Sequence, residues 1–328
     1  MTFNTYKKYY TLPTAVFVFV FFLLALVQIR MARPIILLER FIPGGGWFEV
    51  VVIALYGGFV AYKMQNPVHV PKWRQITWSI FSTVFFLQLI IGLLGFDKFL
   101  MTGKLHLPIP LMIVSGPIYR GQISMMTILF LSTVFLAGPS WCSHLCYFGA
   151  LDRFASSGKT KRATIKNKLA IKSTIFFLAI TVTLLLRWFD VPSLWATILG
   201  VVFGLIGIGV MIFFSRKQGK MVHCALYCPI GSMVHVLKYA NPFRMYIDDS
   251  CDHCMKCTSH CKYDALSPQD VKNKKPSYSC TLCGDCLSAC KGNSIKYKYL
   301  NLNPATSRNL YLFLTITLHA VFLALARI

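Results

Sequence analysis

Seven long apolar runs constrain the fold of this chain more than any other feature of its sequence. Most of them reach the length of about 17 to 25 residues that an α-helix needs to cross the hydrocarbon core of a bilayer. Only 14% of the residues are charged, whereas soluble domains carry roughly 25%. We therefore expect a mostly α-helical polytopic membrane protein, with spans at 12–29, 47–62, 76–96, 123–138, 170–189, 194–214 and 310–326. The stretch 107–117 is apolar but interrupted by prolines, so we expect a loop there.

The formal charge of +23 could indicate a nucleic-acid partner, but the positions of the charges favour another explanation. When the N-terminus is placed inside and the spans alternate, 26 of the 34 Lys and Arg residues fall on the inner side. Inner loops of membrane proteins are enriched in these residues. We therefore expect membrane lipid and no nucleic acid as a partner, with the N-terminus in the cytoplasm and the C-terminus outside.

Eight of the twelve cysteines lie in a polar segment, 241–309, and form two copies of the spacing C-x2-C-x2-C-x3-C. In ferredoxins with two [4Fe–4S] clusters, three closely spaced cysteines bind one cluster and the fourth binds the other. We assign the first cluster to Cys251, Cys254, Cys257 and Cys290. The second cluster is assigned to Cys280, Cys283, Cys286 and Cys261.

The alternatives for this segment are a disulfide scaffold and zinc sites. A cytoplasmic location disfavours disulfides, and zinc sites usually join one cysteine pair to a distant second pair. Lys262 and Lys291 stand where the bacterial ferredoxin pattern has proline, but proline is not a ligand. We therefore predict a membrane domain with six spans at 1–240, an inserted cytoplasmic α+β ferredoxin domain at 241–309, and a C-terminal transmembrane helix at 310–328.

The remaining four cysteines form a second internal repeat, with the pattern C-x3-C-x2-G-[AS]-[LM]: Cys142, Cys146, Cys224 and Cys228. Each pair follows a span that should run from outside to inside, so both pairs are expected at the cytoplasmic membrane edge. Cysteines four residues apart share one face of an α-helix. Three interpretations stay open: ligation of a third cluster or another metal, reversible disulfide chemistry, and inert buried thiols. His144 and His223, inside and beside the motifs, are either ligands or ordinary interfacial histidines.

The polar residues on the outer side in this topology include Glu49, His106, Arg120 and Asp190. Acidic residues within spans are functional candidates, although a carboxylate near the interface is often simply hydrated. Glu49, His106 and Arg120 are our candidates for a site that surrounds a quinone head group.

The two C-x3-C motifs, Pro229 after the second of them, and both ferredoxin quartets together resemble the NapH-type membrane ferredoxins. That family includes the MauN-type proteins and the polyferredoxin portion of NosR-type proteins. The chain departs from the family pattern because no proline follows Cys146, Cys261 or Cys290. The resemblance implies a protein of the bacterial cytoplasmic (inner) membrane that takes part in quinol oxidation and exchanges electrons with partner iron–sulfur or haem subunits.

We therefore expect an electron-transfer subunit of a quinol dehydrogenase or oxidoreductase complex in an anaerobic-type respiratory chain. It would pass electrons between two cytoplasmic [4Fe–4S] clusters, the membrane-edge cysteines and a quinone pool. The alternative is an electron donor or reductase for the maturation of a metalloenzyme, acting on a metal or a disulfide.

Overall fold

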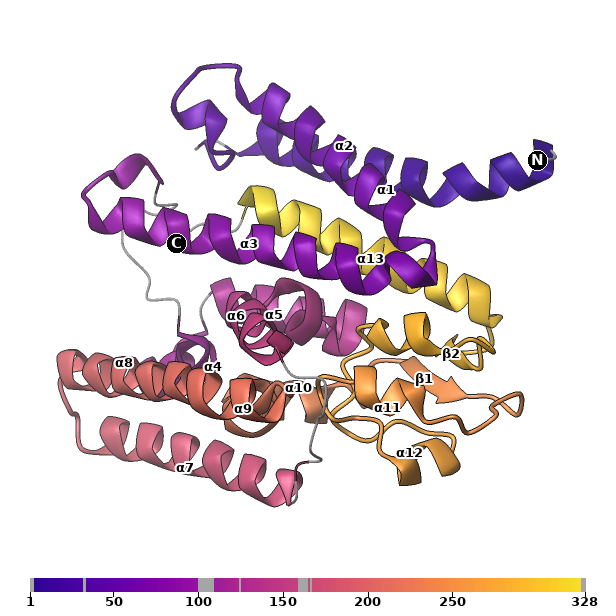
Figure 1. Ribbon diagram of the computed structural model, residues 1–328. Helices are drawn as coiled ribbons and strands as arrows, with labels where there is room; N and C mark the ends of the chain where they lie inside the picture. Colours follow the sequence, from indigo (N-terminus) through magenta and orange to yellow (C-terminus); the bar gives the residue numbers. More distant parts are fainter. Residues whose placement is uncertain are drawn as a thin grey trace. The chain divides into compact units, whose positions relative to one another are not determined.

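The computed structural model describes residues 3–31, 34–99, 109–123, 125–158, 165 and 167–325. The chain forms two compact units (Figure 1). The first unit comprises Met1–Leu107 and Asn301–Ile328, and the second comprises Pro108–Leu300. This division differs from the predicted boundaries after 240 and 309, because the C-terminal helix groups with the N-terminal helices and the cysteine-rich segment groups with the helices that precede it.

Seven helices in the described part of the chain are long and apolar enough to cross a membrane, and each overlaps one predicted span. They are Tyr10–Arg30, Gly46–Met64, Pro67–Leu93, Met126–Leu145, Lys168–Trp188, Ser193–Gln218 and Pro304–Leu325. Large apolar side chains such as Phe177, Trp188 and Leu205 are exposed on these helices. Such exposure is expected where helices face lipid, so the structure is compatible with a multi-pass membrane protein.

The first unit contains four long helices: α1 (Phe3–Arg30), α2 (Gly46–Met64), α3 (Val70–Leu93) and α13 (Pro304–Leu325). Val16 and Val20 of α1 pack with Ala54 of α2 and Ala320 of α13 in one buried cluster. Small residues on α2 allow close approach of the helix backbones, as they do in many membrane helix pairs. A Cβ atom at Gly58, for example, would lie 3.2 Å from the Pro13 carbonyl oxygen.

The second unit begins with a helix where we expected a loop. The proline-rich stretch forms α4 (Pro110–Arg120), with Pro110 at its first turn, where a missing N–H costs no hydrogen bond. The further helices of the unit follow in chain order: α5 (Met125–Ala137), α6 (Tyr147–Ala155), α7 (Lys168–Trp188), α8 (Ser193–Val210), α9 (Arg216–Gln218) and α10 (Pro229–Leu237). Helix α4 contacts α5, α7, α8 and α10.

The cysteine-rich segment is closed by a two-stranded antiparallel sheet, in which β1 (Phe243–Ile247) pairs with β2 (Ile295–Tyr299) in the register Met245 to Tyr297. Between the strands lie two short α-helices, α11 (Lys256–His260) and α12 (Pro268–Lys272), a 3-10 helix at Asp285–Ala289, and irregular chain. In this α+β arrangement Cys257 lies in α11, Cys286 lies in the 3-10 helix, and the other six cysteines of the segment lie in irregular chain. We refer to residues 243–299 as the insert.

Candidate functional site

Four cysteines of the insert lie together near its surface. Burial and the negative charges of Cys290, Cys251 and Cys254 raise the pKa of the Cys257 thiol to about 11. Such electrostatic influence requires that the sulfur atoms lie close to one another. Cys254 is exposed, whereas Cys251 and Cys290 are half-buried. The structure therefore brings together the four residues that we assigned to the first cluster, and leaves them accessible from solvent.

The other four cysteines of the insert form a second group that is more deeply buried. Burial raises the pKa of Cys286 well above its usual range, and the charges of Cys283, Cys261 and Cys280 raise it further. Burial likewise raises the pKa values of Cys261 and Cys280 to about 11. The fourth cysteine of each quartet thus lies with the first three of the other, as the crossed assignment requires.

In both repeats of the insert, a backbone N–H donates a hydrogen bond to the sulfur of the last cysteine. The Ala265 N–H donates to Cys261 Sγ at 3.1 Å, and the Ser294 N–H donates to Cys290 Sγ at 3.2 Å. Hydrogen bonds of this kind stabilise a thiolate over a thiol and tune the potential of a bound cluster. The donor set of the insert therefore fits two anionic clusters.

The four C-x3-C cysteines also come together. The pKa of Cys224 is raised well above its usual range, first by burial and then by the charges of Asp152, Cys228, Cys146 and Cys142. The paired motifs are 82 residues apart, between Cys142 and Cys224, so only the tertiary structure unites them.

We expected the two cysteines of each pair to lie on one face of an α-helix, but the structure places them differently. Each first cysteine lies in a π-helical turn, Trp141–Leu145 or His223–Tyr227, and each second cysteine has extended backbone just before the next helix. The Cys146 N–H bonds to the Trp141 carbonyl at 2.9 Å, which widens the turn. Wide turns of this type are frequent at functional sites.

This geometry also explains the glycine of the C-x3-C-x2-G pattern in each motif. Burial raises the pKa of Cys146 to about 12, while the backbone N–H groups of Gly149 and Phe148 act in the opposite direction. The N–H groups of Gly231 and Ile230 have the same effect on the raised pKa of Cys228. The positive N-terminal ends of α6 and α10 thus face sulfur atoms, which favours the negative form.

Two residues beside these four cysteines were not identified from the sequence. Asp152 is buried on α6, and its carboxylate accepts the Cys224 N–H at 2.9 Å. Burial raises the pKa of Asp152 to about 6. Lys172, which we counted only among basic loop residues, is buried on α7 with its ammonium 3.1 Å from the Cys224 carbonyl oxygen. No sequence signal distinguishes either residue from its neighbours.

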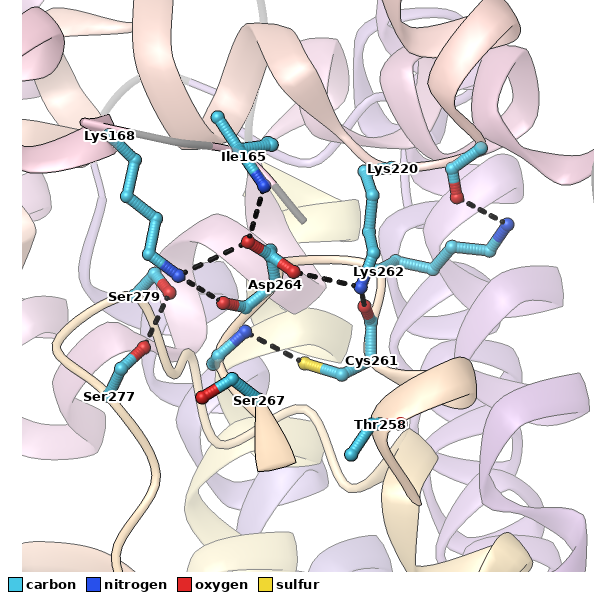
Figure 2. Close-up of polar contacts among 12 residues, drawn as sticks. Ile165, Lys168, Lys220, Thr258, Cys261, Lys262, Asp264, Ser267, Ser277 and Ser279 are labelled. Carbon is cyan, nitrogen blue, oxygen red and sulfur yellow. Dashed lines mark hydrogen bonds and ion pairs between the residues drawn. The ribbon is translucent and has the colours of Figure 1, made fainter. Parts of the chain in front are cut away.

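The segment Cys261–Asp264 joins the insert to the C-x3-C region (Figure 2). The buried Asp264 carboxylate accepts the Ile165 N–H at 3.0 Å and pairs with Lys220 at 3.0 Å and Lys168 at 3.3 Å. Lys220 also donates to the Cys261 carbonyl at 2.9 Å. The Lys262 ammonium lies among backbone carbonyls on the other side and donates to those of Ser156 and Gly219.

Two further hydrogen bonds reach the first C-x3-C motif itself. The Tyr263 hydroxyl donates to the Cys142 carbonyl at 2.6 Å, and the Ser143 hydroxyl donates to the Thr281 carbonyl at 3.2 Å. Tyr263 and Thr281 lie one or two residues from Cys261 and Cys280. Residues next to the second quartet therefore contact residues of the first C-x3-C motif.

The two candidate histidines lie in different surroundings. His144 is buried and its Nδ1 is 2.9 Å from the Ser143 hydroxyl. His223 packs between the rings of Phe148 and Tyr227, and burial lowers its pKa to about 3, so its ring is neutral. Among the described residues, no three His, Cys, Asp or Glu side chains converge on a point that would hold a single metal ion. A cubane cluster is larger than an ion and needs no such convergence.

The predicted quinone residues are distributed over both units of the structure. Glu49 is in the first unit, where it accepts the Leu38 N–H at 2.8 Å. Arg120 and Asp190 are in the second unit, at the end of α4 and after α7, and His106 lies outside the described residues.

A cavity of about 540 Å³ lies between α4, α7 and α8 in the second unit. Its lining is largely apolar, with Tyr119, Arg120 and Ser193 near one end of the helices. Tyr227 lines it at the level of Phe203, with which it stacks at 4.4 Å between ring centroids. Since Tyr227 stands between Cys224 and Cys228, the cavity borders the membrane-edge cysteines.

Comparison with known proteins identifies the chemistry of this region. A family model described as a 4Fe-4S binding domain matches residues 121–164 and 197–243, and each matched segment contains one C-x3-C pair. An uncharacterized protein of Methanocaldococcus jannaschii is 20% identical over 256 residues, which cover 69% of this chain and 96% of that protein. No solved structure matches the chain at a significant level. The prediction of a membrane-associated iron–sulfur protein with a 4Fe–4S binding domain is confirmed, and the narrower resemblance to NapH-type proteins stays a prediction.

Proposed function

We propose that this chain is a multi-pass membrane electron-transfer protein with three [4Fe–4S] clusters in series. The 4Fe–4S binding domain indicates electron transfer, and bound clusters would supply one-electron redox chemistry. The first cluster would be held by Cys251, Cys254, Cys257 and Cys290. The second would be held by Cys280, Cys283, Cys286 and Cys261. The third would be held by Cys142, Cys146, Cys224 and Cys228.

The proximity of the insert to the C-x3-C pairs carries this proposal. The first quartet is exposed at Cys254, the second contains no exposed cysteine, and residues next to the second contact the first C-x3-C motif through the Tyr263 and Ser143 hydrogen bonds. In this order, a soluble or membrane-bound redox partner would exchange electrons with the first cluster, and a carrier in the bilayer would exchange electrons with the third. The positive-inside charge distribution supports a cytoplasmic position for the insert.

We assign a quinone or quinol to the cavity between α4, α7 and α8. The cavity lies among helices that are apolar enough to span the membrane, as a carrier dissolved in the bilayer requires. It borders Tyr227, and thus the third quartet, whereas Glu49 belongs to the other unit. Of the two original quinone residues that the structure describes, Arg120 lines this cavity and Glu49 does not.

Iron analysis of the anaerobically purified chain tests the three sites. We expect about 12 iron atoms per chain, four for each cluster. Cys224→Ser and Cys254→Ser should each lose about four, at the third and the first site respectively, while Ser288→Ala, which removes a hydroxyl that donates to the Asp285 carbonyl, should lose none. Iron that stays at about eight in the unmutated chain and in Cys224→Ser would show that the C-x3-C pairs bind no cluster.

Reduction by a soluble quinol analogue tests the carrier. Ala179→Phe fills the cavity and should slow bleaching of the cluster absorbance at least tenfold. Leu184→Phe is the matched control, because Leu184 is an exposed residue of the same helix that does not line the cavity. Equal rates in both variants would contradict the cavity as the quinol site. If quinols do not reduce the clusters but the protein reduces a metal ion or a disulfide, the alternative role in metalloenzyme maturation is supported.

A further inference from the structure

We propose that Lys172 is the built-in counter-ion of the cluster held by the C-x3-C pairs, and that its charge raises the reduction potential of this cluster. The inference rests on the proposed function, because it requires a cluster at Cys142, Cys146, Cys224 and Cys228. It concerns a residue that contains no sulfur and lies outside both motifs.

The first argument is the burial of a charged group. Lys172 is 2% exposed, and lysine side chains are almost never buried at this level without a charged partner. An ammonium without a counter-charge in an apolar interior is costly. The site must therefore contain something that makes the buried charge acceptable.

The described residues supply no carboxylate for this purpose. The two hydrogen-bond acceptors of the Lys172 ammonium are neutral: the Cys224 carbonyl at 3.1 Å and His235 Nδ1 at 2.9 Å. None of the ion pairs among the described residues includes Lys172. The ammonium lies instead beside Cys224, Cys228 and Cys142, whose side chains would be thiolates in a four-cysteine cluster site. A bound cluster with these ligands would thus provide the missing counter-charge.

The second argument is that the motif leaves space for this amine. A Cβ atom at Gly231 would lie 2.9 Å from Lys172 Nζ and 3.1 Å from the Cys224 carbonyl oxygen. Gly231 is the glycine of the second C-x3-C-x2-G pattern. A larger residue would displace the ammonium from its place between the cysteines and α10.

The third argument is that the position of the ammonium is fixed on its far side as well. His235 of α10 is buried and accepts from Lys172 through Nδ1, so its ring is neutral and carries its proton on Nε2. The same ring packs edge-on against Tyr278, two residues before Cys280, at 5.7 Å between centroids. Lys172 is therefore held on the side of the third site that faces the second quartet.

The consequence follows from charge. A [4Fe–4S] cluster with four thiolate ligands is anionic, and accepting an electron makes it more so. A fixed positive charge nearby stabilises the more negative, reduced form, and the effect is strong where water is excluded. Lys172 should therefore make the membrane-edge cluster a better electron acceptor than it would be with its cysteines alone.

A redox titration followed by electron paramagnetic resonance tests this inference on the full-length protein. The signal that disappears in Cys224→Ser identifies the third cluster. In Lys172→Met, the ratio of reduced to oxidised third cluster at a fixed potential should fall at least tenfold, which corresponds to about 59 mV for a one-electron couple. Lys168→Met is the matched control: it removes an equal charge one turn earlier on α7, where the ammonium pairs with Asp264 instead, and should move this signal much less.

An unchanged potential of the third cluster in Lys172→Met would overturn the inference. If the Met variant folds but lacks about four iron atoms, Lys172→Arg decides: retention of the cluster with arginine supports a need for charge, and loss in both variants overturns it. These results are distinct from failure of the proposed function, which would appear as only about eight iron atoms in the unmutated chain.

Discussion

The two repeats of the insert have identical cysteine spacing but opposite surroundings. After Cys261 the chain continues with Lys262 and Asp264, which are both buried against the membrane-edge segments. After Cys290 the corresponding residues are Lys291 and Asn293, which are both exposed. Asp264 and Asn293 even share a positive φ, of 54° and 51°. Equal spacing predicts two equivalent cluster sites, and the residues after the last cysteine decide which repeat packs against the segments around the C-x3-C motifs.

The largest expected difference between the quartets is their access to solvent. A water-soluble iron chelator, added with a mild oxidant, should remove about four iron atoms rapidly from the quartet that contains exposed Cys254 and the other iron far more slowly. Iron counts over time, with and without Cys254→Ser, would measure this. If all the iron is released in one phase, the quartet that contains Cys254 is no more accessible to solvent than the other cysteine groups, and the prediction is wrong.

Asp264→Ala should destabilise the docked repeat strongly. The substitution leaves the buried Lys220 ammonium and the Ile165 N–H without their partner, and loss of one member of a buried pair costs about 3–5 kcal/mol. Asn293→Ala, at the equivalent position of the exposed repeat, should cost only about 1 kcal/mol, because it loses no buried partner and only replaces asparagine at a positive φ. Denaturant unfolding followed by cluster absorbance compares the two, and equal losses would contradict a docking role for Asp264.

Lys262→Met should have an intermediate effect. The ammonium of Lys262 donates to the carbonyls of Ser156 and Gly219, and hydrogen bonds that involve a charged group contribute about 1.5–3 kcal/mol. Lys291→Met removes the same charge from the exposed repeat and should be nearly neutral. The same unfolding experiment provides the measurement, and a larger loss for Lys291→Met would reverse our assignment of the docked repeat.

Tyr263→Phe should have the smallest effect on stability but a specific effect on electron transfer. It removes one hydrogen bond to the Cys142 carbonyl, which contributes about 1 kcal/mol. Tyr297→Phe is the matched control, because the Tyr297 hydroxyl donates to the Leu282 carbonyl within the insert. Only Tyr263→Phe should slow the appearance of the reduced third cluster after rapid reduction of the insert. The same rate in both variants would mean that this contact does not connect the sites.

The membrane-spanning helices and the cysteine groups could be predicted from local patterns. A span needs only a sufficient run of apolar residues, so the ranges near 12–29 and 194–214 were recognisable without any contact between them. The crossed assignment of the quartets rests on the ferredoxin spacing, in which the fourth cysteine of each run binds the other cluster, and it stays a prediction. The helix α4 was missed because interrupting prolines were given more weight than the favourable first-turn position of Pro110.

The sequence by itself determined how many helices can cross the membrane and which thiols are spaced to share a cluster, since both follow from residues that are close along the chain. Only the tertiary structure decided that Lys172 lies beside Cys224, 52 residues away, and that Asp264 pairs with Lys168, 96 residues away. Burial distinguishes these two residues from the many other charged residues of the chain and makes them partners of the segments that carry the cysteines. A charge acquires such a role only where folding excludes water, and that exclusion depends on segments far apart in the chain.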